Sequence, residues 1–306
     1  MALPLIANGP SPSPADQADL DAMLCTAAQA AEAAGRYLRA HARGPVEFRG
    51  KDDAGDVVSE LDLGAERLIV HRLREAYPEI PVLAEESGLA EAADGAHSPW
   101  LWLVDPLDGT NNLAIGLPTY VVGVALCQSG TPVASAVHEP ETGRTWQARR
   151  GGPLIGPDGG PITRMPHSST DRRQPVVAWT QGYRVANTDP DVGAMKAVLE
   201  RNARRVLQLW APLLAWTMLA RGDIDAFVGY RPELIDLAGG VLLAQAAGLE
   251  MTTLSGNAFE ARLDQHFVPD TDLSFICARP ELMPLLLESV RQARELAPAL
   301  TRVFES

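Results

Sequence analysis

The sequence is poor in cysteine, and the three cysteines form no recognisable pattern. Cys25, Cys127 and Cys277 are far apart, odd in number and without a CxxC pair. This argues against a disulfide framework or a zinc knuckle as the basis of the fold. A reducing cytoplasm is the location that we expect from this cysteine usage.

Long apolar runs are also missing. No hydrophobic stretch approaches the ~18 residues that a membrane-spanning helix needs. The N-terminal MALPLIANGPSPSPAD lacks the basic segment that opens a secretion signal. We therefore expect a soluble protein with no membrane partner, and a loose Pro/Ser-rich leader at residues 1–15.

Basic residues are too few to form a surface for polyanions. The chain has 26 Lys and Arg against 39 Asp and Glu, which gives a formal net charge of −13, and its basic residues occur as short pairs such as Arg149/Arg150. Nucleic acid is therefore not expected as a partner. A phosphate ester would need a bound divalent cation to offset the negative charge locally.

The chain does contain a large apolar fraction, 46% of 306 residues, which suits two lobes of ordinary size. The first lobe, residues 16–155, is expected to open with a long helix from about Ser13, followed by a short strand at 46–49 and a second helix capped by Ser59. Strands PVLA, WLWLV, TYVVGVALC, TPVASAVH and RTWQARR follow. This order predicts helices packed on a largely antiparallel sheet.

A stretch dense in Gly and Pro, residues 151–175, predicts a connection to the second lobe at 170–306. This lobe alternates strands and helices. Strands are expected at 175–180, 204–209 and 224–230, and helices at 189–201, 212–221, 235–247 and from Pro280. The alternation predicts an α/β lobe.

The stretch WLWLVDPLDGTNN places two carboxylates after a strand that is apolar on both faces, as in a strand buried between layers. Pro106 keeps Asp105 out of helical geometry, and Asp108 follows with Gly109 and Thr110 at a helix start. Two carboxylates on a fixed turn beside backbone N–H groups suit a hard cation that bridges to a phosphate oxygen. A plain turn is the alternative, because Asp-Pro and Asp-Gly are common turn dipeptides.

Spacing removes two other interpretations of this stretch. A haloacid dehalogenase-type phosphatase needs a nucleophilic Asp two residues before Asp108, but Pro106 stands there. An EF-hand counted from Asp105 needs Gly at its sixth position and Glu at its twelfth, which hold Thr110 and Gly116.

Other acids occur where either a structural or a functional role would explain them. Glu85 and Glu86 follow the strand PVLA, as a surface charge pair or as metal ligands. Asp56 and Asp62 lie in DVVSELD, where Asp62 could complete a capping box with the preceding serine. Asp236 opens the helix DLAGGVLLAQAAG, where an N-terminal Asp is usually a cap or a partner of the helix dipole.

The order of these motifs is specific: Lys51, DxVSxxD, EES, DPLDGTNN, and an Asp that opens an Ala/Gly-rich helix. In this order the sequence resembles the inositol monophosphatase family of Mg²⁺-dependent, lithium-sensitive phosphatases, from about Lys51 to Gly248. The resemblance implies a layered αβαβα sandwich of the inositol monophosphatase and fructose-1,6-bisphosphatase type. It also implies two or three Mg²⁺ ions between the lobes, and a homodimer.

The resemblance further implies a role for each matching residue. The implied metal ligands are Glu85, Asp105, the backbone carbonyl of Leu107, Asp108 and Asp236. The implied catalytic residues are Glu86 and Thr110, which would orient and activate the attacking water, together with Asp62. Gly109 and Thr110 would offer N–H groups to the phosphate, while Lys51, Asp56 and Asp62 match surrounding positions or a weaker metal position.

Phosphate monoester hydrolysis agrees physically with this set. It needs neutralised equatorial oxygens, a water held in line and a stabilised leaving alkoxide, all of which Mg²⁺ ions can supply. No protein nucleophile is required, so we expect His138 and His266 to be structural or surface residues.

Departures from the family pattern fall in the substrate region. Many family members have a small GSA-like or GTA-like run 26 positions before the last Asp of the motif set. Counted back from Asp236 without gaps, this chain has LWAPL there, with Trp210. Seven positions before Asp236, where inositol-selective relatives carry a Glu, this chain has Gly229, and the Trp that usually precedes the Asp is Ile235. The pocket that would read inositol hydroxyls is thus expected to be remodelled, unless Trp210 is a core aromatic.

We therefore expect a Mg²⁺-dependent phosphomonoesterase that acts on a small phosphorylated metabolite by direct attack of a metal-activated water. Inositol phosphate is the family default. A 3′(2′),5′-bisphosphate nucleotidase, a fructose-1,6-bisphosphatase and a histidinol phosphatase are the alternatives. A non-catalytic protein that binds phosphorylated metabolites is a further one.

Overall fold

Two helices and a six-stranded sheet form the first half of the protein. The structure, a computed structural model, describes residues 14–51, 55–93, 98–162, 174–259 and 272–304. Helices α1 (Pro14–His41) and α2 (Glu60–Ala76) pack on each other and on the outer face of the sheet. In the sequence, the antiparallel pair β1 (Phe48–Gly50) and β2 (Val57–Ser59) lies between these two helices.

The six-stranded sheet has the order β4-β3-β5-β6-β7-β8. Its strands are β3 (Val82–Ala84), β4 (Gly88–Ala90), β5 (Trp100–Asp108), β6 (Val121–Gln128), β7 (Thr131–Glu139) and β8 (Arg144–Arg149). Only the β3–β5 pair among these neighbours is parallel, so the expected antiparallel character is confirmed. Helix α3 (Thr110–Ala114) follows β5 directly.

A second sheet of five strands has the order β10-β9-β11-β13-β12. Its strands are β9 (Val176–Gln181), β10 (Arg205–Leu207), β11 (Ala226–Tyr230), β12 (Glu250–Thr253) and β13 (Phe275–Ala278). The strands β10, β9 and β11 run parallel, whereas β13 is antiparallel to both of its neighbours. The helices of this half are α4 (Pro190–Asn202), α5 (Pro212–Arg221), α6 (Leu234–Ala246) and α7 (Met283–Phe304).

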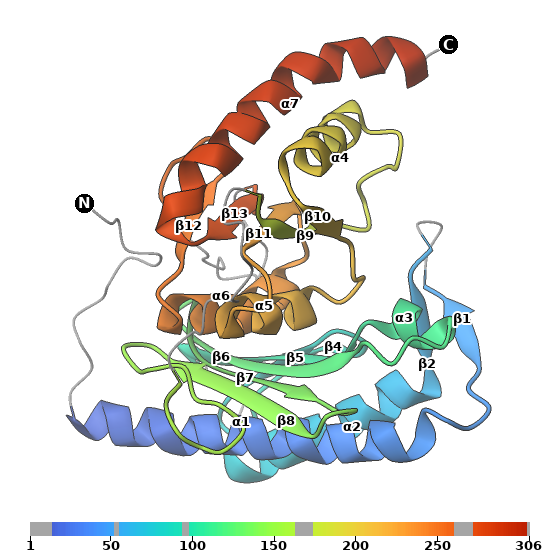
Figure 1. The fold of residues 1–306 in the computed structure, drawn as a ribbon. Coiled ribbons are helices and arrows are strands. Elements are labelled where there is room, and N and C mark those ends of the chain that lie inside the picture. Colours follow the sequence, from blue (N-terminus) through green and yellow to red (C-terminus); the bar gives the residue numbers. More distant parts are fainter. Residues whose placement is uncertain (1–13, 52–54, 94–97, 163–173, 260–271, 305–306) are drawn as a thin grey trace.

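The elements stack in five layers (Figure 1), with α1 and α2 outermost on one side and α4 and α7 outermost on the other. Helices α5 and α6 lie between the two sheets. This place explains why α6 is apolar all round, with residues 237–244 buried. One hydrophobic cluster joins the two sheets through the helices between them, from Val137 of β7 through Trp216 of α5 to Phe275 of β13. The predicted αβαβα sandwich is confirmed.

Some predicted boundaries need correction. Helix α1 begins at Pro14, so the leader expected at 1–15 overlaps the helix, and residues 1–13 lie outside the described part. The first residues of the Gly/Pro-rich connection lie against the first sheet, because Ile155 forms isolated β-bridges with Gln147, in β8, and with Pro161. The helix expected from Pro280 starts as a 3-10 turn, Pro280–Leu282, and β4 was not expected at all.

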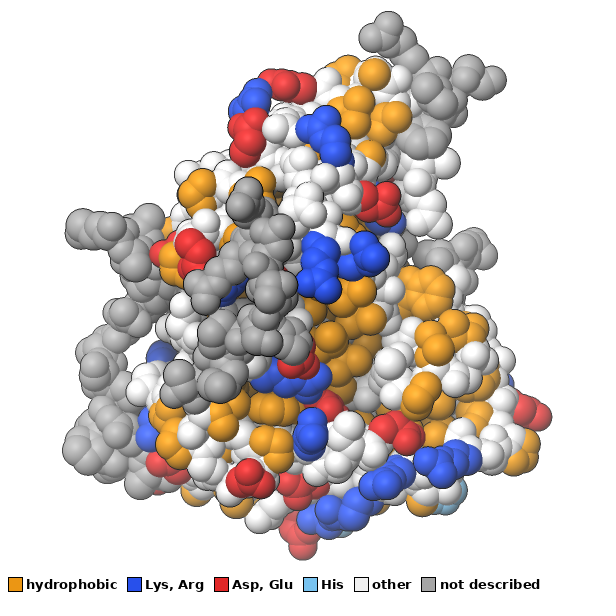
Figure 2. Space-filling view, in the orientation of Figure 1, with side chains coloured by type: hydrophobic (Ala, Val, Ile, Leu, Met, Phe, Trp, Pro, Cys, Tyr) orange, Lys and Arg blue, Asp and Glu red, His pale blue; other side chains and the backbone are white. Residues whose placement is uncertain are grey.

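Charges of both signs are mixed over the surface in view. Figure 2 shows acidic and basic side chains interspersed, with a row of basic side chains along the lower edge, where Figure 1 has the α1 layer. In the part of the chain that the structure describes, no helix is both long and apolar enough to cross a bilayer.

We predict that Gly240→Ala destabilises the protein by about 1–2 kcal/mol, although alanine is the better helix former by about 1 kcal/mol. A Cβ at position 240 would lie 2.0 Å from ring atoms of Trp216, which is fully buried, and overpacking of this kind typically costs about 1–3 kcal/mol. Urea denaturation measures the difference. Gly160→Ala is the matched control, because no atom lies within 4 Å of the added Cβ; equal stability of the two variants would contradict the prediction.

Candidate metal and catalytic site

Three carboxylates from both halves of the chain meet at the end of β5. Oxygen atoms of Asp105, Asp108 and Asp236 lie within 4.8 Å of one another. Asp105 and Asp108 are buried at the end of β5, and Asp236 is half-buried in the first turn of α6. The pairing of β5 with β6 is irregular between Asp105 and Asp108, so both carboxylates reach the same place.

Glu85 and Glu86 join this cluster because β3 runs parallel to β5 and ends at the same edge of the sheet. The backbone N–H of Glu85 donates to the carbonyl of Val104, at 3.1 Å, and fixes the segment that follows β3. The Lys51 ammonium lies 2.8 Å from Glu85 and 2.5 Å from Glu86, and 3.6 Å from Asp56. The predicted residues around the metal position therefore lie together.

Burial and mutual repulsion act on these acids in the same direction. Burial raises the pKa of Asp105 well above its usual range, and the neighbouring carboxylates raise it further. The pKa of Asp236 is raised for the same two reasons. Burial alone would lower the pKa of Lys51, but Glu85 and Glu86 more than offset this and raise it. One ammonium thus faces more negative charge than it can neutralise.

Asp108 also caps a helix of the other lobe. Its Oδ2 accepts hydrogen bonds from the backbone N–H of Leu213 (2.7 Å) and of Leu214 (3.2 Å) in the first turn of α5. The residue at the cap position of α5 is Ala211, which has no side chain for this purpose. Burial raises the pKa of Asp108, and these two donors oppose the rise. This contact was not visible in the sequence.

Asp62 makes the capping contact that its position suggested and a second contact, with Thr110, that was not predicted. Its Oδ2 accepts from the backbone N–H (2.8 Å) and the hydroxyl (2.6 Å) of Ser59, as in a capping box. Its Oδ1 accepts from the Thr110 hydroxyl at 2.7 Å, and the Leu107 carbonyl lies 3.0 Å from the same hydroxyl. Capping and positioning of Thr110 are therefore shared between two oxygens of one carboxylate.

Gly109, before α3, has a backbone conformation that favours glycine. Its φ is +105°, and an added Cβ would lie 2.8 Å from the carbonyl oxygen of Thr119. The following helix, α3, begins with Thr110. The backbone N–H groups expected to meet a phosphate thus lie at a turn that only glycine suits at position 109.

Glu86 has a partner that was missed in the sequence. Its backbone N–H donates to Glu66 Oε2, at 2.8 Å, and Glu66 is buried on α2. Burial raises the pKa of Glu86 to about 7, assisted by the charge of Glu85 and opposed by Lys51. Glu66 lies four residues after Asp62, on the same face of α2, and this spacing was the available signal.

The two residues expected in the substrate pocket differ in their positions. Gly229 is in the core of β11, where an added Cβ would lie 2.3 Å from the Phe275 ring, so its expected place in the pocket is corrected. Trp210 lines a pocket beside Asp236, together with Tyr183 and Glu233. Its side chain is 52% exposed, so it is not a core aromatic.

Tyr183 and Glu233 were not singled out in the sequence. Tyr183 follows the carboxyl end of β9, a parallel strand, and ligands commonly bind at such ends. Burial raises the pKa of its phenol, and so do the charges of Asp56 and Asp236, because the phenol faces the acidic cluster. Glu233 precedes Asp236 by three residues, which places it one helical turn away.

The histidine prediction holds for His138. Its side chain is buried, its Nδ1 lies 3.0 Å from the Thr145 hydroxyl, and its ring fills the space beside Gly35 of α1. Burial lowers its pKa. His266 lies outside the described residues.

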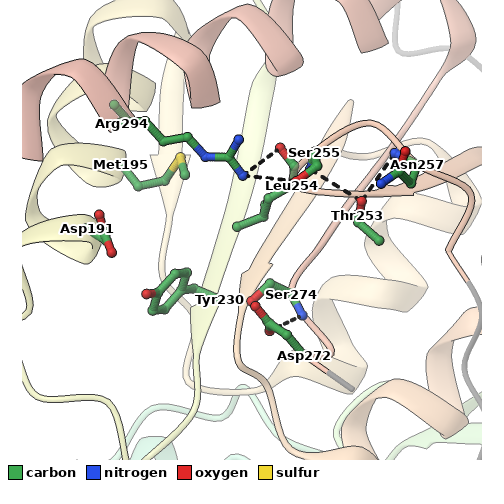
Figure 3. A pocket seen from close by; sticks show the side chains of 11 residues that line it. Asp191, Met195, Tyr230, Thr253, Leu254, Ser255, Asn257, Asp272, Ser274 and Arg294 are labelled. Atoms are coloured by element: carbon green, nitrogen blue, oxygen red, sulfur yellow. Dashed lines mark hydrogen bonds between the residues drawn. The ribbon is translucent and has the colours of Figure 1, made fainter. Parts of the chain in front are cut away.

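A larger cavity lies elsewhere and does not contain this chemistry. It has a volume of about 470 Å³ and lies between α4, α7 and the second sheet, where Asp191, Tyr230 and Arg294 line it (Figure 3). None of the candidate metal ligands lines it. The acidic cluster, rather than cavity size, therefore identifies the candidate site.

Comparison with known proteins agrees with this geometry. The sequence profile of the inositol monophosphatase family matches residues 19–295 of this chain. The chain belongs to this family. A relative from Thermotoga maritima, named fructose-1,6-bisphosphatase/inositol-1-monophosphatase, is 31% identical over 208 residues, which cover 67% of this chain and 75% of that protein.

Solved structures agree on the fold. The suhB extragenic suppressor protein of Bartonella henselae has a TM-score of 0.75 at 25% identity, over 88% of this chain and 98% of that one. An IMPase/NADP phosphatase complexed with Mg²⁺ and phosphate has a TM-score of 0.67 at 22% identity, over 89% and 95%. The family acts on small phosphorylated substrates and is Mg²⁺-dependent, so the chain is a phosphatase of this family.

We predict that Mg²⁺ raises the melting temperature of the chelator-treated protein by roughly 5 °C at about 100 times its Kd, because the ion binds the folded state and offsets the repulsion among the acids. Differential scanning fluorimetry over millimolar Mg²⁺ measures this, with NaCl at equal ionic strength as the salt control.

The residue dependence of this shift is equally specific. Asp236→Asn should reduce it, whereas Glu250→Gln, a change in β12 outside the cluster, should keep it. A melting temperature independent of Mg²⁺ in the wild type would contradict a metal site in this cluster.

Proposed function

We propose that the protein hydrolyses a phosphomonoester with Mg²⁺ ions held by Glu85, Asp105, the Leu107 carbonyl, Asp108 and Asp236. The observation that carries the proposal is the meeting of three carboxylates within 4.8 Å, two of them buried. Such a group is unfavourable on its own and suits a hard cation with oxygen ligands. Two or three ions are the number that the family resemblance suggests.

The residues present fit Mg²⁺ by their chemistry. Carboxylates and a backbone carbonyl are the oxygen donors that this ion prefers. When bound, Mg²⁺ would supply positive charge to the phosphate oxygens and lower the pKa of a water. The rest of the chemistry falls to the chain itself.

Thr110 and Asp62 are suited to orient the attacking water. Because the Thr110 hydroxyl donates its proton to Asp62 at 2.7 Å, its lone pairs remain free to accept a hydrogen bond from water. Ser59 holds the other oxygen of Asp62, so the pair has a fixed direction. Glu86, which follows Glu85 and lies beside these groups, is proposed to accept a proton from the water.

The reaction that these groups would assist is a single displacement. The water oxygen forms a bond to phosphorus, the bond from phosphorus to the ester oxygen breaks, and a proton is returned to the leaving alkoxide. The N–H groups of Gly109 and Thr110 are proposed to hold the phosphate during this step. No covalent enzyme intermediate is involved.

Inositol 1-phosphate is the default substrate, because of the family. Fructose 1,6-bisphosphate, adenosine 3′,5′-bisphosphate and histidinol phosphate are the alternatives for a phosphate-release screen with Mg²⁺. A homodimer, inhibition by lithium and a cytoplasmic location are further proposals from the family resemblance. A non-catalytic role is disfavoured because every carboxylate of the proposed metal cage is present.

We predict that Asp108→Asn reduces phosphate release below detection while the fold is kept. The amide oxygen can still accept the hydrogen bonds of Leu213 and Leu214, whereas the negative charge for the metal is lost. Asp108→Ala should lose the cap as well, at a cost of about 1 kcal/mol in stability. Malachite green assays and urea denaturation measure the two effects, and turnover in Asp108→Asn would refute the assignment.

A further inference from the structure

Trp210 has two unfavourable features at a position beside the acidic cluster. Its indole is 52% exposed, and its backbone φ of 50° lies in the left-handed region that favours glycine. Core packing explains neither feature. Strain of this kind is concentrated at functional sites, so a role in binding is the explanation to test.

The segment that carries this indole is fixed at both ends. The Leu209 carbonyl accepts a hydrogen bond from the Asn112 side chain, in α3. On the other side, Pro212 opens α5 and Leu213 donates its N–H to Asp108. Hydrogen bonds on both sides of the ring therefore connect its segment to Asp108, a proposed metal ligand, and to Asn112 of α3.

The pocket under Trp210 combines aromatic, amide and carboxylate groups. Tyr183, Gln181, Gln208 and Glu233 line it with Asp236. No Lys or Arg is among its described lining residues. Glu233 is exposed at the start of α6, and in the described part of the chain it makes no ion pair within 4.0 Å. A second phosphate would find no cation among the described residues that line the pocket, whereas a positively charged group would find the carboxylate of Glu233.

We propose that this pocket selects a phosphomonoester whose alcohol carries a flat, nitrogen-containing ring and a positively charged group, with the ring stacked on Trp210 and the charge paired with Glu233. The inference rests on the proposed function and narrows its substrate. Planar rings stack on indole, and cations are attracted to its face. Among the four esters named above, histidinol phosphate has an imidazole ring, an ammonium group and a single phosphate.

The test compares kcat/KM of the full-length protein with Mg²⁺ on four monoesters. Histidinol phosphate has a flat ring and an ammonium group, benzyl phosphate a flat ring without charge, inositol 1-phosphate a non-planar ring of hydroxyls, and glycerol 2-phosphate no ring. We expect the wild type to prefer histidinol phosphate to inositol 1-phosphate and glycerol 2-phosphate by about tenfold or more, since aromatic stacking has effects of this order.

Two variants separate stacking from charge. Trp210→Gly should lower kcat/KM for both flat-ring esters by on the order of tenfold relative to glycerol 2-phosphate, mainly through KM. Glu233→Gln should lower it for histidinol phosphate and spare benzyl phosphate. Leu296→Ala, which shortens another exposed apolar side chain, on α7, is the control and should change neither.

Stability provides an independent readout. Glycine suits the left-handed backbone at position 210, so Trp210→Gly should melt at the same temperature as the wild type or higher. A loss of ring selectivity without a loss of stability is not expected of a merely structural tryptophan.

The failures of the two proposals are distinguishable. Hydrolysis of all four esters with equal kcat/KM, or unchanged ring selectivity in Trp210→Gly, would overturn the ring-binding pocket and leave the phosphatase intact. Absence of Mg²⁺-dependent hydrolysis of every ester, histidinol phosphate included, would overturn both.

Discussion

Repulsion among buried carboxylates is the constraint on which this site depends. Asp105, Asp108 and Asp236 are close together where water is scarce, and each raises the cost of ionising the others. The fold compensates for part of this charge. The first turn of α5 offers two N–H groups and the positive end of its dipole to Asp108, and Lys51 forms ion pairs with Glu85 and Glu86. The remaining charge is what a divalent cation would neutralise.

The same constraint connects the two halves of the chain. Asp108 ends a strand of the first sheet but caps a helix from the second half, and Asp236 arrives on α6, which packs between the sheets. A hydrophobic cluster that includes Val137, Trp216 and Phe275 holds these layers together. The acidic site is therefore assembled only when both sheets have packed, and cation binding is coupled to that packing.

Local patterns predicted much of this arrangement. The apolar run WLWLV predicts a strand buried on both faces, and the alternation after residue 175 predicts the second sheet with its helices. Parallel pairing of β3 with β5 then brings the acids after PVLA beside those after WLWLV. What the sequence could not show were contacts between distant residues. The cap from Asp108 to Leu213 joins residues 105 positions apart, and Gly229 is explained by Phe275, which lies across the β11–β13 pair.

A structural role and a proposed functional role are compatible in one residue, Asp62. Asp62 caps α2 through one oxygen and holds Thr110 through the other, because a carboxylate has more acceptor sites than a cap uses. Trp210 shows the opposite case. There, the structural explanation fails, because an exposed indole in a left-handed backbone stabilises nothing that the structure shows. A residue that departs from the rules of folding without a compensating contact in the fold is the better guide to what the site binds.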